Sequence, residues 1–120
     1  MVPSPKIQPD ELARIAVTMA SEKLASDIVM LDLIGVSDFT DFFIILTAES
    51  TRQMNAITDD IQASIEAQNA NLHHREGNAN SGWILLDFGD LIVHIFSPEQ
   101  REYYDIESVW DQGTETVRIQ

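Results

Sequence analysis

Two apolar segments near the C-terminus, residues 83–88 and 91–96, constrain the fold more than any other part of the chain. Only Gly89 and Asp90 separate them, and glycine at the first position of a two-residue loop is typical of a type II′ turn between antiparallel strands. This turn predicts one wholly apolar face, on which Phe88 pairs with Leu91, Leu86 with Val93 and Ile84 with Ile95. The other face pairs Asp87 with Ile92, Leu85 with His94 and Trp83 with Phe96. We expect the apolar face to lie on helices and the mixed face to be open to another molecule.

Apolar residues at helical spacing predict a helix over residues 10–26, and Pro9 directly before it suits the start of a helix. Ser50 and Gln53 fit a capping box, in which the serine hydroxyl accepts from the amide three residues on and the glutamine side chain reaches back. The helix that follows is expected to end near residue 69. Ser97, followed by a proline, predicts the start of a short third helix.

β-branched and aromatic runs predict further strands at residues 28–33, 41–47 and 115–119. The polar segment 71–82 is predicted to be a loop. Strands on both sides of a central helix indicate an α/β fold with a mixed β-sheet packed with helices. The chain is predicted to form a single domain over residues 10–120, preceded by a flexible N-terminal arm over residues 1–9 that holds three prolines.

Twenty acidic residues against seven Lys and Arg give a net charge of −13, which repels phosphate backbones. We therefore expect no direct nucleic-acid binding, and a basic protein is the more plausible partner. The alternative is an acidic surface that serves solubility only. The chain has no cysteine, which excludes disulfides and Cys-based zinc sites. No apolar run is long enough for a membrane span and no targeting segment is visible, so a cytoplasmic protein is expected.

One enzymatic interpretation is a divergent metal-dependent nucleotidyltransferase, which needs two carboxylates alternating on one strand. Asp41 and Asp87 are candidate acids, but the alternate partner of Asp41 is Phe43. His73 and His74 point apart in an extended chain, and no third ligand has metal-site spacing. We therefore expect no catalytic residue, no metal and no cofactor.

The predicted open face carries Trp83, Asp87 and His94, and tryptophan is enriched at interface hot spots. Trp83 is expected to be exposed. A histidine in the middle of a strand, such as His94, is more often a hydrogen-bonded structural residue than a catalyst, and a contact role beside Trp83 is the alternative. Trp110 is better placed in the core. Residues 99–115 add six acids and one base, a charge run that suits a basic partner but is often only a solvated surface.

Several motifs in this order resemble the Iojap/RsfS family of ribosomal silencing factors. They cover about residues 10–111 and comprise Thr40-Asp41-Phe42-Phe43 with Ser50 and Gln53, His74-Arg75-Glu76-Gly77, Trp83 with Asp87, Gly89 and Asp90, Val93-His94-Ile95-Phe96, and Arg101 with Tyr103, Tyr104, Glu107 and Trp110. The departures are mild: Phe42, Ala48, Ile106 and Val109 stand where the family commonly has other residues.

The resemblance implies a nucleotidyltransferase-like fold without the catalytic acids. It also implies binding to the large ribosomal subunit through its basic protein L-fourteen, which sterically blocks joining of the small subunit and lowers translation, notably when nutrients are limited. Free members of the family are expected to form homodimers, and a role in large-subunit assembly without silencing is the alternative. On this basis the partner-binding residues are predicted to be Trp83, Asp87, His94, Arg101, Tyr103, Tyr104 and Glu107.

Overall fold

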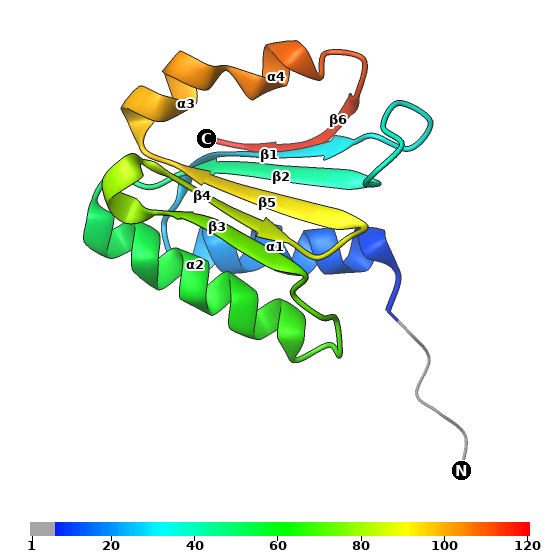
Figure 1. Ribbon diagram of the computed structural model, residues 1–120, viewed down its shortest axis with the longest axis horizontal. Coiled ribbons are helices and arrows are strands. Elements are labelled where there is room, and N and C mark those ends of the chain that lie inside the picture. Colours follow the sequence, from blue (N-terminus) through cyan, green and yellow to red (C-terminus); the bar gives the residue numbers. More distant parts are fainter. Residues whose placement is uncertain (1–6) are drawn as a thin grey trace.

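The computed structural model describes residues 7–120 and contains one six-stranded sheet with helices on both sides (Figure 1). The helices are α1 (Pro9–Glu22), α2 (Thr51–Glu66), the 3-10 turn η1 (Ala79–Ser81), α3 (Pro98–Tyr104) and α4 (Ile106–Val109). The strands are β1 (Ser26–Asp32), β2 (Phe42–Thr47), β3 (His74–Asn78), β4 (Trp83–Asp87), β5 (Leu91–Phe96) and β6 (Thr114–Ile119). In the order β3-β4-β5-β2-β1-β6, β2 and β5 are parallel and the other neighbours are antiparallel. The predicted mixed α/β sheet is therefore confirmed.

The predicted helix caps are present, although both long helices are shorter than predicted. Ser50 Oγ accepts from the Gln53 amide at 3.1 Å, while Gln53 Oε1 reaches back to the amide of Glu49 at 2.6 Å, one residue before the expected one. α1 ends at Glu22 because Leu24 takes a φ of 65°, which no helix continues. None of the described helices has the length and apolarity that a membrane span requires.

Of the predicted arm, residues 1–6 lie outside the described part of the chain. Ile7 is half-buried and packs against the core, and Pro9 already forms the first turn of α1. At the other terminus the predicted last strand is confirmed as β6, which pairs with β1 at the edge of the sheet.

The β4–β5 hairpin has the register that the apolar alternation predicts. Leu86 pairs with Val93 and Ile84 with Ile95 on one face, and Leu85 pairs with His94 on the other. Gly89 has a φ of 89°, a conformation that costs glycine little, and Asp87 Oδ1 accepts from the Gly89 amide at 2.8 Å.

The prediction of a loop over 71–82 is wrong, because this segment contains β3 and η1. Every residue of β3 is exposed, so the strand has no apolar alternation that would mark it in the sequence. Its pairing with β4 requires Gly77, which has a φ of 85°, and a Cβ there would lie 2.0 Å from the Trp83 carbonyl oxygen.

The first core lies between the sheet and α1 and α2, as expected (Figure 1). It contains the apolar hairpin face together with the inward stripe of α2, namely Met54, Ile57, Ile61 and Ile65.

A second core lies on the opposite face of the sheet and overturns the prediction that this face is open. Its buried residues include Phe43, Ile45, Ile92 and Phe96, and the partly buried Trp83, Leu85, Ile106 and Trp110 pack against it. The segment formed by α3 and α4 runs over this face (Figure 1). Trp110 is half-buried in this cluster, in agreement with its predicted core position.

Candidate functional site

An aromatic ridge, formed by Trp83, Tyr104 and Tyr103, stands where α3 meets β4. The Trp83 and Tyr104 ring centroids are 4.6 Å apart, and those of Tyr104 and Tyr103 are 5.0 Å apart. Trp83 also stacks on Phe96, with 4.9 Å between centroids, which fixes the plane of its ring. Tyr103 and Tyr104 are 71% and 46% exposed, while Trp83 is half-buried rather than fully exposed as predicted.

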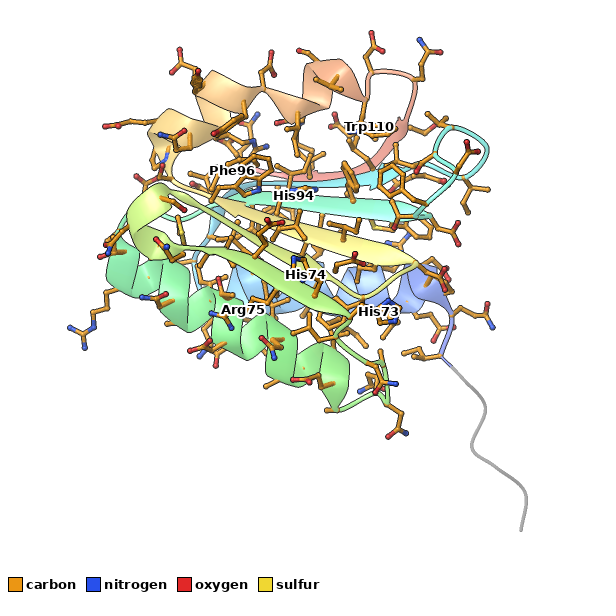
Figure 2. All side chains as sticks on the ribbon, in the orientation of Figure 1. His73, His74, Arg75, His94, Phe96 and Trp110 are labelled. Atoms are coloured by element: carbon orange, nitrogen blue, oxygen red, sulfur yellow. The ribbon has the colours of Figure 1, made fainter. Side chains whose placement is uncertain are left out.

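His94 lies beneath this ridge and not on an open surface. Its side chain is only 4% exposed, so the predicted placement of His94 on an open face of the sheet is wrong. Strand β5 is covered here by the α3–α4 segment, and Figure 2 shows His94 between the sheet and that segment.

The buried imidazole holds Trp83 in place. Trp83 Nε1–H donates to His94 Nδ1 at 3.2 Å, so the neutral ring carries its proton on Nε2. Burial lowers the pKa of His94 from 6.5 to about 3, because the charged form would lose its hydration. Within residues 7–120 the Nε2 atom has no hydrogen-bond partner, and Phe43 packs edge-on at 4.6 Å between centroids.

A shallow hollow adjoins the ridge on the side of β3. It measures about 220 Å³ and is lined by Glu76, Gly77, Trp83 and Leu85. Its far wall is β3, so the hollow exists only because the segment predicted as a loop pairs with β4. An apolar floor beside the Glu76 carboxylate suits an apolar side chain with a basic neighbour.

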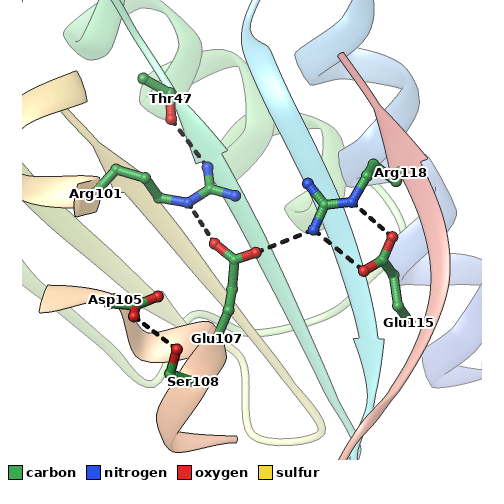
Figure 3. Close-up of polar contacts among 7 residues, drawn as sticks. All are labelled: Thr47, Arg101, Asp105, Glu107, Ser108, Glu115 and Arg118. Carbon is green, nitrogen blue, oxygen red and sulfur yellow. Dashed lines mark hydrogen bonds and ion pairs between the residues drawn. The ribbon is translucent and has the colours of Figure 1, made fainter. Parts of the chain in front are cut away.

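Arg101 and Glu107, both predicted as contact residues, belong to an ion-pair chain among residues of the protein itself (Figure 3). Arg101 Nε donates to Glu107 Oε1 at 2.7 Å and Arg101 Nη1 donates to Thr47 Oγ1 at 2.9 Å. The other Glu107 oxygen accepts from Arg118 at 3.2 Å, and Arg118 also pairs with Glu115 at 2.7 Å. The hydrogen bond from Arg118 lowers the pKa of Glu115. This chain links α3 and α4 to β2 and β6, so it holds the segment that carries the tyrosines.

Asp87, the remaining predicted contact residue, caps the hairpin turn through Gly89 and is half-buried. The structure therefore brings Trp83, Tyr103 and Tyr104 together at the surface and uses His94, Arg101 and Glu107 to support them. Sequence reasoning missed the wall residues Glu76 and Leu85. The alternation of β4 places Leu85 beside Trp83 on one face, but nothing in the sequence revealed the partner strand.

The acids proposed for nucleotidyl transfer do not form a metal-binding group. Phe43, the alternate partner of Asp41, is buried against His94 and Trp110. Among residues 7–120 there is no cluster of three His, Cys, Asp or Glu side chains suited to a metal ion.

Comparisons with known proteins agree on one family. The family model described as "Ribosomal silencing factor during starvation" matches residues 6–120. A ribosomal silencing factor of Halalkalibacterium halodurans is 34% identical over 110 residues, which cover 92% of this chain and 93% of the relative. The chloroplastic protein Iojap of Zea mays is 39% identical over 118 residues, covering 93% of this chain and 51% of the relative. A crystal structure of a Chromobacterium violaceum protein superimposes with a TM-score of 0.83 at 27% identity, covering 95% of this chain and 94% of that one.

Proposed function

The chain belongs to the ribosomal silencing factor family, a class of factor and not of enzyme, and from this premise we propose that it binds the large ribosomal subunit and blocks joining of the small subunit. The proposed contact is the basic ribosomal protein L-fourteen, and the proposed outcome is lower translation when nutrients are limited. The observation that carries the proposal is the aromatic ridge, which combines exposed tyrosines with a tryptophan fixed by packing and a hydrogen bond.

Charge supports a basic protein as the partner. The net charge is −13, and within residues 7–120 four of the six Lys and Arg side chains are paired with acids of the same chain: Lys23, Arg75, Arg101 and Arg118. Around the ridge, Glu76, Glu99 and Glu102 are exposed. A basic surface would be attracted to this region, whereas ribosomal RNA would be repelled.

The mechanism is mutual exclusion at one surface. If the factor and the small subunit cannot occupy the same face of the large subunit at the same time, each large subunit that binds the factor is unable to join a small subunit. No chemical step is needed. We expect the protein to act in the cytoplasm and to be able to form homodimers when free, which sedimentation velocity will test.

Co-sedimentation with separated ribosomal subunits tests the proposal. The wild-type chain should pellet with large subunits, and Trp83→Ala should weaken binding by about 1–3 kcal/mol because it removes a central aromatic anchor. Tyr103→Ala provides a second variant in which the lost side chain is 71% exposed, so the fold should be unaffected. Thr18→Ala, exposed on α1 across the sheet, is the control and should bind like wild type.

Light scattering then measures subunit joining directly. Wild-type protein should slow or prevent the increase in scattering when small subunits are added to large ones, and Trp83→Ala should do so only at higher concentration. If both ridge variants bind large subunits as wild type does, the contact surface lies elsewhere on the protein. A wild-type chain that fails to bind large subunits at low salt would refute the proposed function.

A further inference from the structure

A second exposed apolar surface lies at the other end of the sheet from Trp83. Trp83 pairs with Phe96 at the end of β5, whereas the loop before β2 lies beside Leu91 at the start of β5. Four exposed apolar side chains lie on the loop between β1 and β2 and at the end of α4, and we call them the Phe39 patch: Ile34, Val36, Phe39 and Val109, with exposed fractions of 61%, 39%, 58% and 69%. Large exposed apolar side chains on neighbouring segments can mark an interaction site.

Hydrogen bonds hold the loop between β1 and β2 that carries Ile34, Val36 and Phe39. The Leu33 amide donates to the Asp41 carbonyl at 2.8 Å and closes the loop, and the Val36 amide donates to the Leu33 carbonyl at 2.9 Å. Ser37 Oγ accepts from the Phe39 amide at 3.2 Å. A surface fixed before binding loses little conformational entropy when a partner arrives.

α4 completes the patch through Trp110. The Phe39 ring meets the Trp110 ring edge-on, with 5.5 Å between centroids, and Trp110 is anchored in the second core by Phe43 at the same distance. Figure 2 shows Trp110 beside the β1–β2 loop, at the opposite end of the face from Phe96. Val109, which precedes Trp110 in the sequence, is exposed at the end of α4.

The charges around the patch are all negative on its own segments. Residues 32–41 and 105–113 contain acids and no Lys or Arg. Ile34 of the patch also lines a hollow of about 410 Å³ together with Asp10, Asp32 and Asp41, and among the described residues that line it Arg14 is the one base. A lysine or arginine side chain could extend its apolar stem past Ile34 and place its charge beside Asp41.

This charge pattern decides between occupants. At this patch, a second copy of the chain would place the acids of residues 32–41 and 105–113 against the same acids of its partner. RNA would be repelled for the same reason. A protein with an apolar centre and a basic rim matches both features.

We propose that the Phe39 patch is a second docking surface of this chain, and that it contacts a basic protein surface of the large ribosomal subunit with a lysine or arginine entering the hollow beside Asp41. This inference rests on the proposed function, because it assumes that the large subunit is the partner. Two separate contacts on one subunit would make the second intramolecular and raise the overall affinity.

The test measures the Kd for separated large subunits at two salt concentrations. Phe39→Ser/Val109→Ser should weaken binding by about tenfold, a typical cost of losing an aromatic anchor and its neighbour. Val109→Ser alone, which removes a side chain that is 69% exposed, keeps the test valid if the double variant unfolds, and should weaken binding by a smaller factor. Leu24→Ser is the matched control, because Leu24 is 80% exposed in the turn between α1 and β1 and should tolerate the change without loss of binding. Asp41→Asn should weaken binding at low salt and have less effect at high salt.

The outcomes separate the two proposals. If wild type binds and Trp83→Ala weakens binding while the Phe39 patch variants bind like wild type, the patch proposal is overturned and the proposed function stands. If wild type does not bind large subunits, the proposed function fails first. A loss of homodimers in sedimentation velocity, with subunit binding unchanged, would show that the patch is a self-association surface and would also overturn the inference.

Discussion

Mild acid should destabilise this protein through one side chain, His94. In the folded chain burial lowers the pKa of His94 to about 3, whereas in the unfolded chain the value is the ordinary 6.5. Below pH 6.5 the His94 imidazole therefore binds a proton in the unfolded state but not in the folded state. The stabilisation by the neutral ring is fully present above pH 6.5 and is lost as the pH falls toward 3.

The size of the effect follows from the gap between the two pKa values. Between pH 7 and pH 5 the free energy of unfolding should fall by about 2 kcal/mol from this group alone. His94 is 4% exposed, so solvent screening reduces the effect little. For a domain of this size, with a stability of roughly 5–15 kcal/mol, such a loss is easily measured.

Urea unfolding at pH 7, 6 and 5, monitored by far-ultraviolet circular dichroism, gives the free energy of unfolding at each pH and so its slope against pH. His94→Gln is the control, because a glutamine oxygen can still accept from Trp83 Nε1 but the side chain does not titrate. All other titrating groups are shared, so the difference between the two slopes belongs to His94. Equal slopes for the two proteins would show that the imidazole is not held neutral in the folded state, and the argument would fail.

Three further changes test the framework that supports the ridge, each by urea unfolding at pH 7. Glu107→Gln should cost about 2 kcal/mol, because the charge-assisted bonds to Arg101 and Arg118 are lost, and an unchanged midpoint would show that the α3–α4 segment is held by packing alone. Gly77→Ala should lower the free energy of unfolding by at least about 2 kcal/mol, because a Cβ would clash with the Trp83 carbonyl and the φ of 85° is strained for alanine. An unchanged free energy of unfolding would mean that β3 can shift away from β4 at little cost. Ser50→Ala should cost about 1 kcal/mol by removing the cap of α2, and Ser50→Thr should restore most of it.

The predictable and unpredictable parts of the fold differ in how locally they are encoded. The β4–β5 register was predicted because alternation and a glycine in the turn act within a dozen residues, and Leu86 opposite Val93 satisfies both. Strand β3 was not predicted, because an exposed edge strand is held by its backbone hydrogen bonds to β4 and has no hydrophobic pattern in the sequence. The nature of the mixed face was misjudged for a related reason: Ile106 and Trp110 cover it from a segment with no fully buried residue, so their sequence pattern gives little sign of a second layer.

The burial of His94 changes the interpretation of the site more than any other correction. A polar ring in an aromatic core is costly unless its hydrogen bonds are satisfied, and here one of its nitrogens is bonded and the other is not. The bonded nitrogen fixes the indole of Trp83, whose ring already packs against both Phe96 and Tyr104. An aromatic side chain fixed in this way loses little rotamer freedom when a partner covers it, so more of its contact energy remains as affinity. His94 is then a positioning residue for Trp83: replacing it with alanine should weaken binding to large subunits even though the residue itself touches no partner.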